Sequence, residues 1–133
     1  MIPDFDELGN LPPGVHRATL EEVAVRFGRQ SEVRRVQIES LAWLVALARK
    51  SGAARLIVNG SFVTEKLEPN DVDCLVLTSA EFPRDRSAAA EMLTGLPFMG
   101  IQVVAEEAFK IFVDEVFSSD RDENPKGMVE VIL

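Results

Sequence analysis

The sequence predicts a single domain of mixed class, α/β or α+β, built on a small mixed sheet of about four strands flanked by helices. Segments with helical periodicity alternate along the chain with short apolar runs bounded by turn residues, which is the order expected when helices and strands share one layered core. The length of 133 residues fits one domain. We expect residues 1–18 to form an extended N-terminal arm and residues 19–133 to form the domain.

Two helices are predicted in the first half of the chain from their capping residues. Thr19 followed by Glu22 is a capping-box pattern, so a short helix is expected over 20–27. Ser31 can cap a second helix, which Gly52 would end. The residues of this second helix that we expect in the core are Val33, Val36, Leu41, Trp43, Leu44, Val45 and Ala48.

The strands are predicted from apolar runs of five or six residues between turn signals. They are expected at 55–59, 72–77, 101–105 and 128–133. Helical character is expected over 83–93 and 107–117.

Charge and composition exclude several classes of function. Acidic residues outnumber basic ones by 22 to 14, so a nucleic acid would meet net repulsion, and unaided binding to DNA or RNA is not expected. No apolar run reaches the roughly 20 residues that span a bilayer, and the first residues lack the pattern of a signal peptide, so we expect a cytoplasmic protein with no membrane contact. The single cysteine, Cys74, and the single histidine, His16, provide neither a disulfide nor a structural zinc site.

One constellation has the residue types and the spacing needed for chemistry. Gly60 and Ser61 directly follow a predicted strand, and Asp71 and Asp73 open the next one. Side chains at i and i+2 of a strand share a face, so the two carboxylates repel each other unless a cation such as Mg²⁺ lies between them. A glycine lets the backbone approach a phosphate, and a serine adds a hydroxyl and an N–H donor. Lys66, in the loop between the two pairs, is a candidate phosphate contact.

Each of these residues also has a simpler interpretation. The aspartates could mark a solvated turn after Pro69, and the glycine and serine could form a tight turn. Lys66 could be an ordinary solvated charge. Arg121 and Lys126 could approach an anion, although Asn124-Pro125 and Gly127 favour a turn over 120–127. We favour the metal site because the two pairs occur in this order at a workable distance.

These residues also carry a resemblance to a known family. Asn59-Gly60-Ser61-Phe62 followed by Asn70-Asp71-Val72-Asp73 resembles the signature of the polymerase-beta-like nucleotidyltransferases, particularly the small bacterial members of the MNT and antitoxin type. Nearly the whole chain is similar to a family of small bacterial proteins of about this length. That similarity rests on Ile2-Pro3-Asp4-Phe5-Asp6, Leu11-Pro12-Pro13-Gly14, Gly60-Ser61-Phe62-Val63-Thr64, Asp120-Arg121-Asp122 and Asn124-Pro125-Lys126-Gly127.

The resemblance implies a nucleotidyltransferase-like fold and a reaction. Asp71 and Asp73 would be the catalytic, magnesium-binding pair, and Gly60 with Ser61 would bind the triphosphate of a nucleoside triphosphate. The enzyme would transfer a nucleoside monophosphate to an acceptor hydroxyl. Active members usually supply a third carboxylate from a neighbouring strand, and here Gln102 stands where we expect it.

Two other functions remain open. If Gln102 marks a lost carboxylate, and neither Glu106 nor Glu107 replaces it, the chain is a catalytically degenerate binding module, such as the antitoxin of a toxin–antitoxin pair. The third alternative is an interaction protein that binds no nucleotide.

We also expect a protein partner, either a second copy or a separately encoded protein. The larger superfamily members use added helical domains to select an acceptor, and this chain has none. Its last strand is apolar, and at a sheet edge it would offer unpaired N–H and C=O groups to another chain. The residues concerned are Val129, Val131, Ile132 and Leu133.

Overall fold

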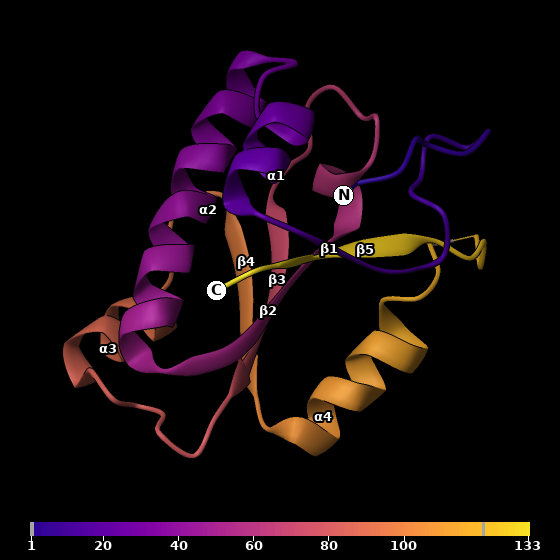
Figure 1. Ribbon diagram of the computed structural model, residues 1–133. Helices are drawn as coiled ribbons and strands as arrows, with labels where there is room; N and C mark the ends of the chain where they lie inside the picture. The colour runs from indigo at the N-terminus through magenta and orange to yellow at the C-terminus, as the bar shows by residue number, and fades with distance from the viewer. Residues whose placement is uncertain (1, 121) are drawn as a thin grey trace.

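The computed structural model describes residues 2–120 and 122–133 and is built on one mixed sheet of five strands in the order β1-β5-β2-β3-β4 (Figure 1). The strands are β1 (Gly14–Ala18), β2 (Ala53–Asn59), β3 (Val72–Thr78), β4 (Met99–Val104) and β5 (Gly127–Val131). β1 pairs with β5, and β3 with β4, in parallel, whereas β2 runs antiparallel to both of its neighbours. The chain therefore has the predicted mixed α/β class.

Four α-helices accompany the sheet. They are α1 (Leu20–Phe27), α2 (Glu32–Ser51), α3 (Arg86–Thr94) and α4 (Glu106–Ile111). A 3₁₀ helix, η1 (Gly60–Val63), follows β2, and a π-helical turn, η2 (Phe112–Val116), continues α4. None of the helices in the described part of the chain is long and apolar enough to cross a membrane.

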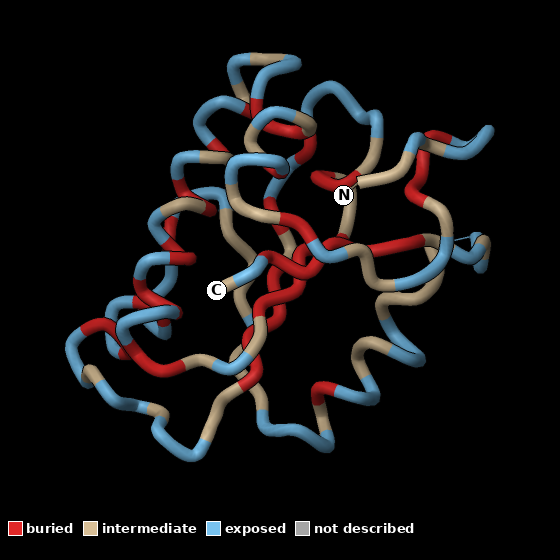
Figure 2. The backbone as a smooth tube through the Cα atoms, in the orientation of Figure 1, coloured by how far each residue is buried: buried red, intermediate tan, exposed pale blue. Residues whose placement is uncertain are grey.

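The helices lie on both faces of the sheet. α1, α2 and α3 cover one face and α4 covers the other (Figure 1). Alternate residues of β3 join the two cores: Val72, Cys74 and Val76 pack in the larger cluster with α1 to α3, whereas Leu75 and Leu77 pack in the smaller cluster with α4. In Figure 2 buried residues follow the central strands of the sheet. Asp73 therefore belongs to the face that α4 covers.

The two predicted caps of the long helix are confirmed. The Ser31 side chain accepts a hydrogen bond from the Arg34 N–H, and Gly52 ends α2 in the left-handed region with φ 82°. Thr19 and Glu22 form the complete capping box of α1. Local side-chain chemistry fixes these boundaries, which explains why they can be recognised from sequence.

The fifth strand differs from the expectation. Residues 14–18 belong to the segment expected as an extended arm, yet they form β1 and pair with β5 from Gly14↔Gly127 to Ala18↔Val131. Leu11 and Ala18 are almost completely buried in the larger core. The arm therefore contributes to the sheet and to the core.

The position of β5 contradicts the basis of our partner expectation. β5 lies between β1 and β2, so its backbone groups pair on both sides. The C-terminal strand is not an edge, and the edges of the described sheet are β1 and β4.

The core-facing residues of α2 also differ from the prediction. Val36 and Trp43 were expected in the core and are instead 43% and 48% exposed, whereas Arg34 and Gln37 are buried. Both side chains donate hydrogen bonds to main-chain carbonyls, Arg34 to Phe27 and Phe62 and Gln37 to Pro69, which allows their N–H groups to be buried. The Oε1 atom of Gln37 has no hydrogen-bond partner in the described structure.

Candidate functional site

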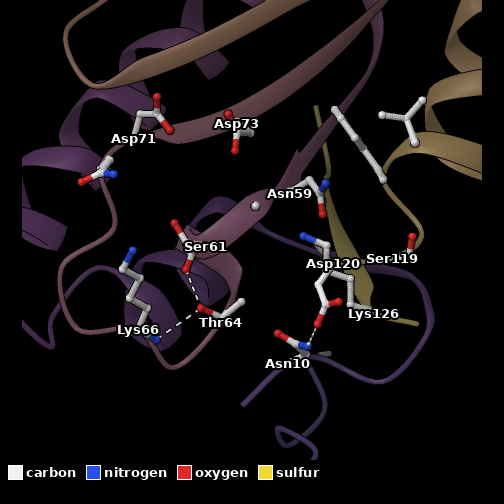
Figure 3. A pocket seen from close by; sticks show the side chains of 14 residues that line it. Asn10, Asn59, Ser61, Thr64, Lys66, Asp71, Asp73, Ser119, Asp120 and Lys126 are labelled. Carbon is white, nitrogen blue, oxygen red and sulfur yellow. Dashed lines mark hydrogen bonds between the residues drawn. The ribbon is translucent and has the colours of Figure 1, made fainter. Parts of the chain in front are cut away.

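A cleft of about 710 Å³ opens at the end of β2 and the start of β3 (Figure 3). It contains all five residues that the sequence singles out, Gly60, Ser61, Lys66, Asp71 and Asp73. Its other lining residues are Asn10, Asn59, Thr64, Asn70, Val116, Phe117, Ser119, Asp120 and Lys126. The structure therefore brings the two halves of the predicted site together in one cavity.

Asp71 and Asp73 line this cleft two residues apart. Asp73 lies on β3 and pairs across the sheet with Asn59, the last residue of β2, while Asp71 precedes the strand and is exposed. Burial raises the pKa of Asp73, and the negative charge of Asp71 raises it further. The two carboxylates are therefore close enough to repel each other, which is the condition under which a cation between them is stabilising.

Two glycines flank the Asp73 carboxylate. Gly60 has φ +76°, and a Cβ atom at this position would lie 2.1 Å from Asp73 Oδ2. A Cβ atom at Gly100, the partner of Asp73 on β4, would lie 3.0 Å from Asp73 Oδ1. Gly60 is thus required by both backbone conformation and space, and the η1 backbone lies directly against the carboxylate.

The residues after Gly60 turn back on themselves as η1. The Ser61 carbonyl accepts hydrogen bonds from the Thr64 N–H, at 3.2 Å, and from Thr64 Oγ1, at 2.7 Å. Thr64 Oγ1 in turn accepts a hydrogen bond from the Lys66 N–H. Figure 3 draws this bond as a dashed line. Ser61 is half-buried and Lys66 is exposed, so both can meet a ligand in the cleft.

Asn59 is a feature of the cleft to which the sequence analysis assigned no role. It is only 5% exposed, and its buried Oδ1 atom has no hydrogen-bond partner in the described structure. An unpaired buried amide oxygen is costly, and here it stands next to Asp73 in the sheet register. A cation or a hydrogen-bond donor bound in the cleft would satisfy it.

The opposite wall carries a lysine and a third aspartate. Burial lowers the pKa of Lys126, and the carboxylates of Asp73 and Asp120 act in the other direction. Asp120 accepts bonds from the N–H groups of Asn124 and Asp122, both at 2.9 Å, and these bonds lower its pKa. Asp120 therefore shapes the turn that was predicted over 120–127 from Asn124-Pro125 and Gly127, while Lys126 presents a positive charge to the cleft. Arg121 lies outside the described residues.

The residue of β4 beside Asp73 is not Gln102, where we looked for a third carboxylate, but the residue two positions earlier. β4 places Gly100 beside Asp73, whereas Gln102 pairs with Leu75. Gln102 lines a smaller cavity of about 250 Å³ that also touches Asp73. Glu106 and Glu107 begin α4 and are not part of the cleft lining. A side chain at residue 100 would crowd Asp73, which accounts for the glycine there.

The donor set can be tested against a magnesium ion. Mg²⁺ takes oxygen ligands and is commonly held by one or two carboxylates together with water or phosphate oxygens. Asp71 and Asp73 provide the carboxylates and Asn59 provides an unpaired amide oxygen. Within residues 2–120 and 122–133 no group of three or more His, Cys, Asp or Glu side chains could hold a metal. The residues thus fit a cation that is held partly by these protein oxygens and partly by oxygens of a bound anion.

The fold and the cleft define a class of protein: an α/β domain with a glycine-serine turn and an aspartate pair at the ends of adjacent strands. Comparison with known families assigns the chain more narrowly. It belongs to a family of unknown function, DUF6932, which it matches over residues 3–132. No curated protein and no solved structure gave a significant match.

Proposed function

We propose that the cleft binds a magnesium nucleoside triphosphate and that the chain transfers its nucleoside monophosphate to an acceptor hydroxyl, as in the polymerase-beta-like nucleotidyltransferases. The observation that carries this proposal is the convergence of Gly60-Ser61 with Asp71 and Asp73 in one cleft, next to an unpaired Asn59 oxygen. The resemblance of the sequence to that superfamily rests on the same residues.

Each residue has a distinct part in this proposal. Asp71 and Asp73 would hold the metal, and Ser61 would donate its hydroxyl or N–H to phosphate oxygens. Lys126 and Lys66 offer positive charge from opposite sides of the cleft. When bound, Mg²⁺ supplies charge neutralisation on the triphosphate. The protein contributes position and electrostatic complementarity, which provide most of the catalysis in phosphoryl chemistry.

A second candidate function is nucleotide binding without transfer, as in a degenerate or antitoxin-like module. It is favoured by Gly100, which stands beside Asp73 where a third carboxylate would help to deprotonate the acceptor. The aspartate pair and the glycine turn would then bind a ligand, and the ligand would serve as a signal or a structural element.

The acceptor and the partner form part of the same proposal. Nucleoside triphosphates are cytoplasmic metabolites, so we place the activity there. A second copy of the chain or a separately encoded protein would present the acceptor, because the net charge of −8 disfavours direct capture of a nucleic acid. Such a partner could reach the sheet through the edge strands β1 or β4.

The test is calorimetric titration of the protein with ATP, GTP, CTP and UTP in the presence of Mg²⁺ or EDTA. The wild-type protein should bind at least one nucleotide only with Mg²⁺, and the Asp71→Asn/Asp73→Asn variant should bind it at least about tenfold more weakly. Glu106→Gln/Glu107→Gln is the matched control, because it removes two exposed charges outside the cleft.

Transfer is then measured by following an α-phosphate label from the bound nucleotide into the protein, RNA and small-molecule fractions of a cell extract. Magnesium-dependent labelling that the aspartate variant abolishes supports transfer. Binding without labelling supports the second candidate. If the wild-type protein binds none of the four nucleotides, both candidates are wrong.

A further inference from the structure

Arg34, on the first turn of α2, is buried behind the loop that forms the cleft. It is 2% exposed, and within residues 2–120 and 122–133 all the hydrogen-bond acceptors of its guanidinium group are main-chain carbonyls. The acceptors and distances are Phe27 (3.0 Å), Ser61 (3.4 Å), Phe62 (2.7 Å), Thr64 (2.8 Å) and Lys66 (3.0 Å). Four of these five carbonyls belong to the segment that starts at Gly60-Ser61.

No acidic partner of this cation is found in the described part of the chain. Among the described residues the ion pairs do not include Arg34, and its guanidinium lies over the Phe62 ring, with Cζ 5.2 Å from the ring centroid. Burial lowers the pKa of Arg34 to about 10, so the side chain remains charged at neutral pH. A buried positive charge therefore stands directly behind the η1 turn, next to carbonyl dipoles and the face of the Phe62 ring.

Gln37 repeats this arrangement one helical turn later. Its side chain is fully buried, and Nε2 donates to the Pro69 carbonyl at 2.6 Å. Pro69 comes just before Asn70 and Asp71 at the other end of the same loop. Two polar residues at i and i+3 of α2 thus hold the start and the end of the loop.

We propose that Arg34 and Gln37 are positioning residues that fix loop 60–70 against α2 and so set the distance between the glycine-serine turn and the aspartate pair. The carbonyls of Ser61, Thr64 and Lys66 that accept these bonds belong to residues lining the cleft, so losing the bonds would let this wall of the cleft move. The buried guanidinium also places a positive charge close to an anion bound against the turn. This inference rests on the proposed function for the identity of that anion, a magnesium nucleotide.

The test uses Arg34→Lys in the full-length chain, with Arg55→Lys as the matched control. Arg55 pairs with Glu130 and lies over the Phe109 ring, away from the cleft. Lysine keeps the charge in both variants but cannot reach several carbonyls at once. Hydrogen exchange of backbone amides and the Kd for MgATP are measured at a temperature where circular dichroism shows all proteins to be folded.

In Arg34→Lys we expect amide exchange within residues 60–70 to rise about tenfold or more, because at least one charge-assisted hydrogen bond is lost. Exchange in β2 and β3 should stay unchanged, and the Kd for MgATP should weaken about tenfold. Arg55→Lys should change neither the loop exchange nor the Kd. Gln37→Met gives a second, milder variant, in which faster exchange should be confined to the residues near Pro69.

The possible failures can be told apart. If neither Arg34→Lys nor Gln37→Met changes loop exchange, or if exchange rises equally over the whole sheet, the positioning role is wrong. Faster loop exchange with an unchanged Kd for MgATP overturns the positioning role alone. If the wild-type protein binds no magnesium nucleotide, the proposed function fails and the role at its site fails with it.

Discussion

At the scale of single residues, the position of the Asp73 carboxylate requires that residue 60 be a glycine. The backbone of Gly60 has a positive φ, and a Cβ atom there would lie only 2.1 Å from Asp73 Oδ2, so both conformation and space exclude a side chain. Gly60→Ala should lower the free energy of unfolding by about 2 kcal/mol or more and abolish binding of a magnesium nucleotide. Urea unfolding and calorimetric titration measure the two effects.

Gly95 provides the control for this prediction. It also has a positive φ, +104°, but a Cβ atom there would meet nothing within 4 Å. Gly95→Ala should therefore incur the backbone cost alone, about 1 kcal/mol, and leave nucleotide binding intact. If the two variants are equally stable and bind the nucleotide equally well, the close approach of Gly60 to Asp73 matters neither for stability nor for binding.

The aspartate pair should destabilise the protein when no metal is bound. Because the pKa of Asp73 is raised in the folded state, the folded protein binds a proton more tightly than the unfolded chain, and stability falls as pH rises through the window between the two pKa values. Asp71→Asn/Asp73→Asn removes this loss. In EDTA at pH 7 its Tm should exceed that of the wild type by about 3 °C, since a partly exposed pair contributes at most about 1 kcal/mol.

The same comparison has a pH control and a metal control. Below the ordinary aspartate pKa Asp73 is protonated in the wild type, so the difference in Tm should disappear there. Mg²⁺ should raise the Tm of the wild type but not that of the variant. A variant that is less stable than the wild type at pH 7 in EDTA would show that the aspartates stabilise the fold instead.

At the residue scale, the sequence identified the cleft residues that depend on local spacing and missed those that depend on tertiary contacts. Gly60 and Asp73 could be found because a turn and an i, i+2 pair flank two strands. Arg34 could not be found, because a polar residue on a helix reads as exposed until the loop that accepts its hydrogen bonds is known. Lys126 was weighed as an anion contact, but a turn was favoured, because its place in the cleft depends on a segment that is distant from Asp73 in the sequence.

At the scale of elements, β1 is the part of the fold that most needs a test. In the described sheet it pairs only with β5, and Leu11, shortly before it, is fully buried. A chain that starts at residue 19 should therefore fail to fold, because it loses this strand and the core contact of Leu11. A chain that starts at residue 9 keeps both and should unfold cooperatively in urea at reduced stability. Cooperative unfolding of the shorter chain would show that β1 is dispensable.

The helices and strands also divide into those that a local sequence pattern predicts and one that depends on a distant segment. α1 and α2 were predicted with their caps, and the strands β2 to β5 were predicted within about two residues, because each has its own local pattern. β1 follows a Pro-Pro-Gly segment, and its partner β5 lies at the other end of the sequence. Only that pairing makes residues 14–18 a strand. The last helical segment was predicted to end at about residue 117; in the structure the π-helical turn η2 continues α4 and ends at Val116, one residue earlier.

At the scale of the whole molecule, we predict that the protein acts as a homodimer or with a separately encoded partner. The strand that first suggested this is interior, but β4 remains an edge with Gln102 exposed. Light scattering is the measurement, on the purified protein and on protein co-expressed with the product of its neighbouring gene. A strictly monomeric species in both preparations, active as a monomer, would contradict the prediction.

The central claim is that Asp71 and Asp73 hold a divalent cation that also binds a nucleotide. The most direct measurement is a crystal structure with Mn²⁺ and a non-hydrolysable nucleotide analogue, because Mn²⁺ is located by its anomalous signal. We predict an anomalous peak within about 2.5 Å of oxygens from both aspartates, with the triphosphate against Gly60 and Ser61. A peak away from both aspartates, or an analogue bound outside the cleft, would contradict the account.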